Sequence, residues 1–261
     1  MNKSFECLIE EAIEKSTELQ KILNNEFRDV PPILWFGNVE SPKPKVLVIS
    51  ANPNRPDFPE DNPRVPYCTT WKEGGRDIKE LENDFNNYFR IDLNRNPATN
   101  WFGKNNAQEG QGRIEQFLNG LDASFYDGNY KYQAIHIDLL PFSTDTTFTK
   151  IDNYLMAIEG LPEWVDKHVK ELIELIQPQL IIINGNSNFN FFNQCVNIGA
   201  QPYKALVLPL KSSKETKATI WVSNNKPTII ATSINMGSYC MHSWDTIMAL
   251  GQQVKNKLKF E

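Results

Sequence analysis

The chain has few of the residues that usually build metal centres or disulfide frameworks. Its 261 residues include four cysteines and three histidines, and no two cysteines form a CxxC pair. Because a zinc site needs several such ligands at short spacing, the sequence predicts neither a metal site nor another cofactor. Scattered cysteines are typical of reduced thiols, and we expect a cytoplasmic protein. These residues are Cys7, Cys68, Cys195, Cys240, His136, His168 and His242.

Long apolar runs and an excess of positive charge are also missing. No run approaches the roughly 20 apolar residues that span a bilayer, and no apolar leader core follows the first residues, so we expect no membrane contact. The net charge of −5 gives an overall field that does not attract polyanions, although a local basic patch can still bind nucleic acid. The apolar share of 40 % suits a chain that buries a sizeable core.

Apolar β-branched runs alternate with amphipathic segments along the chain. The runs predict buried strands, and apolar residues at a spacing of three to four predict helices between them. This alternation is typical of an α/β fold, with three α/β/α layers around a four-stranded, mostly parallel central sheet. We expect residues 1–30 to form an N-terminal helical arm and residues 31–261 to form one domain. The four buried strands are predicted at 46–50, 132–140, 180–183 and 228–232, a further strand pair at 205–208 and 218–222, and helices at 4–25, 77–90, 112–121, 161–177, 187–197 and 243–258.

Polar residues stand at the end of each buried strand. Asn52 follows the first strand, Asp138 lies near the end of the second, Asn184 follows the third and Asn235 the fourth. The carboxyl ends of parallel strands meet at one edge of a sheet, which is where open α/β sheets bind ligands. Amides and hydroxyls with one or two carboxylates are suited to bind a neutral heterocycle and to position water. The sequence therefore predicts one site at this edge.

Three segments resemble the uracil-DNA glycosylase superfamily, and the likeness extends from about residue 33 to the C-terminus. Ser50-Ala51-Asn52-Pro53-Asn54 is similar to the family's first motif, in which a strand leads to a small residue, a variable residue, Asp or Asn, and then Pro. The stretch 97–102 looks like one found in mismatch-type members. Asn235-Met236-Gly237-Ser238 stands where the family has a His/Asn-Pro-Ser loop. The order of predicted elements also fits the family's parallel core.

The resemblance implies a DNA-repair hydrolase that cleaves the N-glycosidic bond of a flipped base. Asn52 would hold the water that attacks the sugar, and Asn235 would stabilise the departing base. Asp138 would read the base, and an aromatic residue would stack on it. The partner would be DNA with a damaged or mismatched base, bound by a monomer. The other substrate-binding residues implied are Ala51, Pro53, Tyr67, Trp71, Ser238 and His242.

Two other functions stay open. The same pocket would serve a binding module that recognises a base or nucleotide without chemistry, which the acidic net charge and Met236 in place of the motif's proline favour. An unrelated hydrolase or transferase needs a nucleophile at a strand-to-helix turn, for which Ser187 is the candidate, but the chain has no Gly-x-Ser-x-Gly elbow. Among the histidines, we expect His136 to lie in the core and His168 to be solvated on a helix.

Overall fold

The structure is a computed structural model of residues 1–261, and most of these residues are described below. The strands are β1 (Lys45–Ser50), β2 (Ala123–Ser124), β3 (Tyr132–Asp138), β4 (Leu180–Ile183), β5 (Lys204–Pro209), β6 (Lys217–Val222) and β7 (Thr228–Thr232). The helices include α1 (Phe5–Leu23), α3 (Ile78–Asn86), α4 (Ile114–Gly120), α6 (Leu161–Ile176), α7 (Asn186–Cys195) and α8 (Trp244–Leu258). The described residues are 3–23, 30–51, 77–90, 102, 112–126, 128–144, 153–198, 203–210, 217–223, 226–237 and 240–260.

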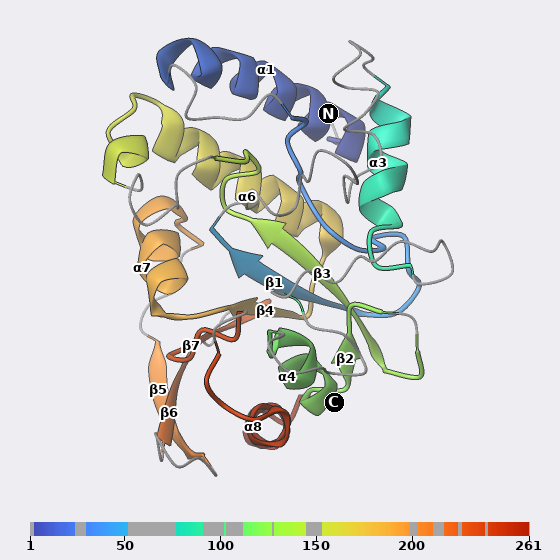
Figure 1. The fold of residues 1–261 in the computed structure, drawn as a ribbon, viewed down its shortest axis with the longest axis vertical. Helices are drawn as coiled ribbons and strands as arrows, with labels where there is room; N and C mark the ends of the chain where they lie inside the picture. The colour runs from blue at the N-terminus through green and yellow to red at the C-terminus, as the bar shows by residue number, and fades with distance from the viewer. Residues whose placement is uncertain are drawn as a thin grey trace.

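One mostly parallel sheet organises the described residues, in the order β2-β3-β1-β4-β7-β6-β5 (Figure 1). The first five of these strands pair in parallel, while β6 pairs antiparallel to both β7 and β5. The predicted α/β class is confirmed, but the sheet has seven strands in the described part of the chain instead of four. The predicted strand pair is β5 and β6, which joins this sheet because the short connection from β6 to β7 only allows antiparallel neighbours.

Burial explains why the central strands form. Every residue of β3 and β4 is buried, as are the last five residues of β1. β4 and residues 46–49 of β1 are continuous apolar runs, whereas β3 also buries Gln133, His136 and Asp138. At the outer edge, β5 is mostly exposed, and Val207 has 59 % of its surface accessible. The hydrophobic core therefore lies around the centre of the sheet, where β1 and β4 are side by side.

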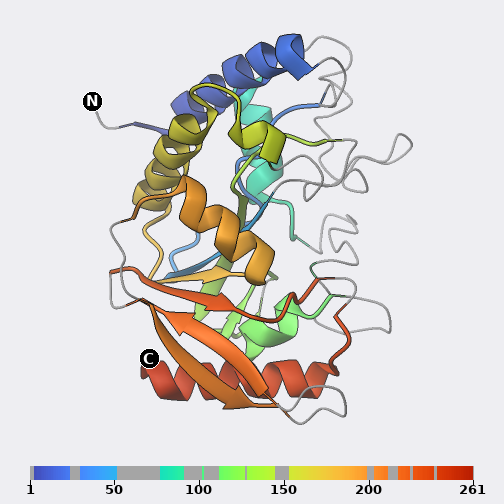
Figure 2. The ribbon, with the colours of Figure 1, turned by 90° about the vertical axis from the view of Figure 1, so that its left-hand side faces the viewer.

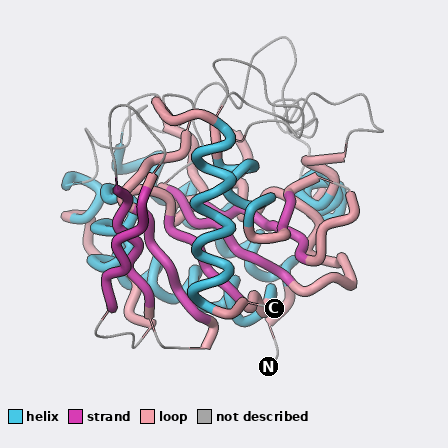
Figure 3. Tube along the Cα trace, turned by 90° about the horizontal axis from the view of Figure 1, so that it is seen from below, coloured by secondary structure: helices cyan, strands magenta, loops and turns pink. Residues whose placement is uncertain are grey.

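Helices cover both faces of the sheet (Figures 1 and 2). The helices α1, α3, α6 and α7 lie on one side, while α4 and α8 lie on the other. Figure 3 looks onto this second side, where α8 runs across the strands. The two helices α4 and α8 approach closely, because a Cβ atom on Gly120 would overlap the carbonyl oxygen of Met248 and one on Gly251 would overlap that of Phe117.

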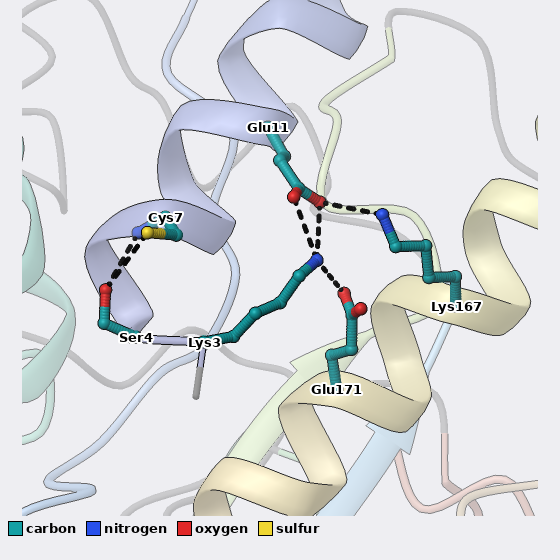
Figure 4. A network of polar contacts seen from close by, with 6 residues as sticks. All are labelled: Lys3, Ser4, Cys7, Glu11, Lys167 and Glu171. Carbon is teal, nitrogen blue, oxygen red and sulfur yellow. Dashed lines mark hydrogen bonds and ion pairs between the residues drawn. The ribbon is translucent and has the colours of Figure 1, made fainter. Parts of the chain in front are cut away.

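An ion-pair network joins α1 to α6 (Figure 4). The Lys3 Nζ atom lies 2.9 Å from Glu11 Oε1 and 2.6 Å from Glu171 Oε2, and Lys167 Nζ lies 3.4 Å from Glu11 Oε2. These side chains are partly exposed, so water screens each pair and each contributes little alone. On the buried side of α1, apolar residues such as Leu8 belong to the hydrophobic core.

His168 is buried, and the prediction that it is solvated is wrong. Its ring stacks on Trp164 with 4.5 Å between ring centroids, and only 2 % of the residue is accessible. The physical reason is helical spacing, since Leu161, Val165, His168 and Leu172 recur every three to four residues and share the buried face of α6. Burial lowers the pKa of His168 to about 3, although the nearby Glu11 acts in the opposite direction.

We predict that His168 makes the fold sensitive to acid. Because the folded state holds the neutral ring, its contribution to stability is complete above the unfolded pKa of about 6.5 and is lost as the pH falls towards 3, at up to about 1.4 kcal/mol per pH unit. His168→Phe keeps a ring against Trp164 and should flatten the curve of unfolding free energy between pH 4 and 6.5. Urea unfolding at several pH values measures it, and parallel curves for both proteins would contradict the assignment.

Glu115 is a fully buried carboxyl group on α4. Its Oε1 atom accepts a 2.6 Å hydrogen bond from Ser124 Oγ, and its Oε2 atom accepts a 3.2 Å bond from the backbone N–H of Phe125. Burial raises the pKa of Glu115 to about 8, and the two hydrogen bonds oppose this only in part. The raised pKa favours the protonated form of Glu115 in the folded protein.

We predict that Glu115 acts in the opposite pH direction. The pKa of Glu115 is higher in the folded than in the unfolded state, so its contribution to stability is complete below the unfolded pKa of about 4.5. This stability is lost as the pH rises through 8, again at up to about 1.4 kcal/mol per pH unit. Glu115→Gln should remove this loss of unfolding free energy between pH 5 and 8.5 in urea titrations. Glu80→Gln, an exposed change on α3, serves as the control and should keep the wild-type slope. Equal slopes in E115Q and wild type would show that the carboxyl is ionised.

Candidate functional site

Four polar residues lie side by side at the carboxyl edge of the sheet. Ser50 pairs with Asp138, and Ile183 pairs with both Ile49 and Ala231, so the next positions, Asn184 and Thr232, continue the same level. Residues at one level of parallel strands point to the same face of the sheet. Their exposed fractions are 3 % for Asp138, 7 % for Ser50, and 0 % for both Asn184 and Thr232. We call Asp138, Ser50, Asn184 and Thr232 the polar row.

The strand order places the middle of this row at a topological switch point. From β1 the chain adds β3 on one side and then returns to add β4 on the other, so the connections diverge between β1 and β4. In open α/β sheets the ligand crevice lies outside the carboxyl ends of such a pair of strands. Ala51 follows β1 here, and its carbonyl oxygen accepts a 2.9 Å hydrogen bond from the N–H of Leu140.

Asn184 connects the end of β4 to the segment that follows β7. Its Oδ1 atom accepts a 2.9 Å hydrogen bond from the backbone N–H of Met236, and its Nδ2 atom lies 3.5 Å from Asn235 Oδ1. Its backbone oxygen accepts a 2.7 Å bond from Asn188 Nδ2. A buried amide is costly unless it is hydrogen-bonded, so this arrangement fixes the position of the 235–237 segment.

Asn235 is exposed beside the buried Asn184, and its orientation is fixed. Its Oδ1 atom accepts a 2.9 Å hydrogen bond from the N–H of Gly237, which turns the amide oxygen towards its own loop. Gly185 has φ +92°, and a Cβ there would lie 3.1 Å from the Cβ of Asn235. Glycine is therefore required at this position for both conformation and space. Within the described ranges its –NH₂ group has no hydrogen-bond acceptor, so it can donate to a ligand at the edge.

Asp138 stands at the other end of the row and is paired within its own strand. Its Oδ1 atom lies 3.1 Å from His136 Nε2, and both side chains are buried. The ring of His136 packs against Phe36 and Phe102, with centroids 5.5 and 5.0 Å apart, so the prediction of a core position for His136 is confirmed. Three strand spacings, about 14 Å in all, separate β3 from β7. Only a ligand larger than one ring would reach both Asp138 and Asn235.

The structure describes four of the nine predicted site residues. Ala51, Asp138 and Asn235 lie at the carboxyl edge, and His242 is buried beyond it, with its backbone oxygen accepting a 3.0 Å hydrogen bond from Arg113 Nε. The predicted residues Asn52, Pro53, Tyr67, Trp71 and Ser238 lie outside the described residues.

Sequence reasoning missed two members of the polar row. Ser50 and Thr232 are the last residues of β1 and β7, and only the register shows that they stand level with Asp138 and Asn184. Thr232 Oγ1 donates a 2.7 Å hydrogen bond to the oxygen of Ile234 and accepts a 3.3 Å bond from the N–H of Gly185. Its hydroxyl therefore supports the same loop as Asn184.

Ser187, the candidate nucleophile, is exposed on the first turn of α7.

The described residues show no group of three or more His, Cys, Asp or Glu side chains that could hold a metal ion. Within the same ranges, no helix combines the length and apolar character needed to cross a membrane. The polar row and Asn235 offer hydrogen bonding by amides and hydroxyls, next to the buried pair of Asp138 and His136.

Comparison with family models and with curated proteins finds no relative of this chain. None of the family models matches the chain, and neither does any curated protein. The resemblance to the uracil-DNA glycosylase superfamily therefore depends on the three sequence segments, and function has to be argued from the site itself.

We predict that Asn184 stabilises both the fold and the loop after β7. Asn184→Ala leaves the buried N–H of Met236 without a partner, which should lower the free energy of unfolding by about 1–3 kcal/mol. Asn188→Ala is the matched control, since it removes only a bond to a backbone oxygen and should cost at most about 1 kcal/mol. Urea unfolding measures both changes. Equal losses in N184A and N188A would show that the Met236 contact is not the stabilising one.

Proposed function

We propose that the chain excises a base from DNA by hydrolysing its N-glycosidic bond. The observation that carries the proposal is the convergence of Ala51, Asn184 and Asn235 at the switch point of a parallel sheet. Asn52, which follows Ala51 directly, would hold the attacking water. An amide orients water but is a weak base, so this chemistry depends on a leaving group that departs readily.

The orientation of Asn235 supports its part in the reaction. Cleavage of the glycosidic bond builds negative charge on the departing base and positive character on the sugar. Preorganised donors aimed at the developing charge are the effective way to stabilise it. Since the Asn235 amide oxygen is held by Gly237 N–H, its –NH₂ group is the part presented to a ligand. The same proposal includes a DNA partner, a monomeric protein and a cytoplasmic location.

The second candidate function is recognition of a base or nucleotide without cleavage. Asp138 favours it, because this buried side chain lies three strand spacings, about 14 Å, from β7, and a nucleotide is long enough to reach both Asp138 and Asn235. In a binding module, Asp138 would accept hydrogen bonds from one end of such a ligand while Asn235 donates to the other end.

We predict that the protein generates alkali-labile sites in oligonucleotides carrying uracil or mismatched bases. Asn52→Ala should slow this reaction by about 100-fold or more because the water loses its position, and Asn235→Ala by a similar factor because the base loses its donor. Strand scission after alkaline treatment measures the rate, in single- and double-stranded substrates.

The matched control is Asn83→Ala, an exposed amide on α3 away from the carboxyl edge, which should keep the wild-type rate. Scission that survives both N52A and N235A would overturn the assigned roles. Binding without scission in the wild-type protein would establish the second candidate, and the absence of both would exclude nucleic acid as the substrate.

A further inference from the structure

Arg113 lies immediately before α4 and contacts the segment after β7 at two points. Its backbone N–H donates a 2.6 Å hydrogen bond to the oxygen of Met236, and its side-chain Nε donates a 3.0 Å bond to the oxygen of His242. The N–H of Met236 is itself bonded to Asn184 Oδ1, so Arg113 adjoins the loop that carries Asn235. Arg113 is thus placed beside the candidate site by its backbone N–H and by one of its five side-chain N–H groups, and a second side-chain N–H makes a long contact.

The guanidinium of Arg113 carries a charge that has no acidic partner in the described part of the chain. The ion pairs found there involve Lys3, Lys15, His136, Lys167, Lys170 and Lys255. Its guanidinium carbon lies over the Trp244 ring, 5.5 Å from the ring centroid, and its Nη1 atom lies 3.5 Å from Gly112 O. Hydrogen bonds at that distance are weak.

Partial burial of this cation has a cost that no acidic partner among the described residues offsets, and that the hydrogen bond to His242 O and the Trp244 ring offset only in part. Burial lowers the pKa of Arg113, and the electrostatic effect of Cys240 acts against this. Removing a charge from water is unfavourable unless an opposite charge or good hydrogen bonds replace the solvent. The guanidinium group is positioned by His242 O and Trp244, and its other N–H groups can donate to an anion.

We propose that Arg113 binds a phosphate group of the nucleic acid held at the carboxyl edge. This inference depends on the proposed function for its ligand. Guanidinium groups match phosphate oxygens with two parallel hydrogen bonds, which makes arginine the usual residue for this contact. Because the whole chain has a net charge of −5, a cation beside the site has to supply attraction that the overall field does not.

Binding of labelled oligonucleotides tests the proposal. The probe carries 2′-fluorinated deoxyuridine, whose glycosidic bond resists cleavage, and fluorescence anisotropy is recorded from 50 to 200 mM salt. Arg113→Gln should weaken duplex binding about 10-fold or more. It should also reduce the slope of log K against log salt by about 0.9, the value for one phosphate contact. Arg113→Lys should keep the slope and lose part of the affinity, since lysine carries the charge without the two-point geometry.

Lys43→Gln is the matched control, because it removes one positive charge before β1, at the amino end of the sheet. It should leave affinity and slope unchanged. Loss of affinity in R113Q with an unchanged salt slope would mean that Arg113 only supports the loop, and it would overturn the inference. Wild-type affinity in R113Q would overturn it while leaving the proposed function standing. No binding by the wild-type protein would overturn both.

Discussion

The hydrogen bond from the backbone N–H of Met236 to the side-chain oxygen of Asn184 is the interaction on which the candidate site depends. β4 has only four residues, all apolar and buried, and the chain needs a polar residue directly after it to leave the core. Asn184 is that polar residue, and it stays buried because its side-chain oxygen accepts a hydrogen bond from the backbone N–H of Met236 in the loop after β7. The contact fixes the segment after β7, and the Gly237 N–H then sets the orientation of Asn235.

The regular elements could be predicted because their sequence pattern reports burial directly. β4 and β7 have the predicted bounds, and α6 ends within one residue of its predicted limit. β2 could not be predicted, since two residues carry no periodicity. The burial of His168 was not predicted, although its spacing from Val165 and Leu172 places it on the buried face of the helix.

The site was less accessible to sequence reasoning than the fold. Asp138, Asn184 and Asn235 stand out because each follows a run of apolar residues. Ser50 and Thr232 belong to the same level only through the register of neighbouring strands, which depends on where each strand begins to pair. Arg113 contacts His242 across 129 positions of sequence, and no local pattern signals such a contact.

The two outer strands of the sheet restrict how it can grow. β2 has two residues, so a further strand would gain few backbone hydrogen bonds there. At the opposite margin β5 begins with Lys204 and ends with Pro209, which has no N–H to donate. Short edges, edge lysines and edge prolines are devices by which natural sheets avoid pairing with other chains. Val207 is exposed on β5, but the lysine and the proline of this edge strand oppose pairing with a strand of another chain.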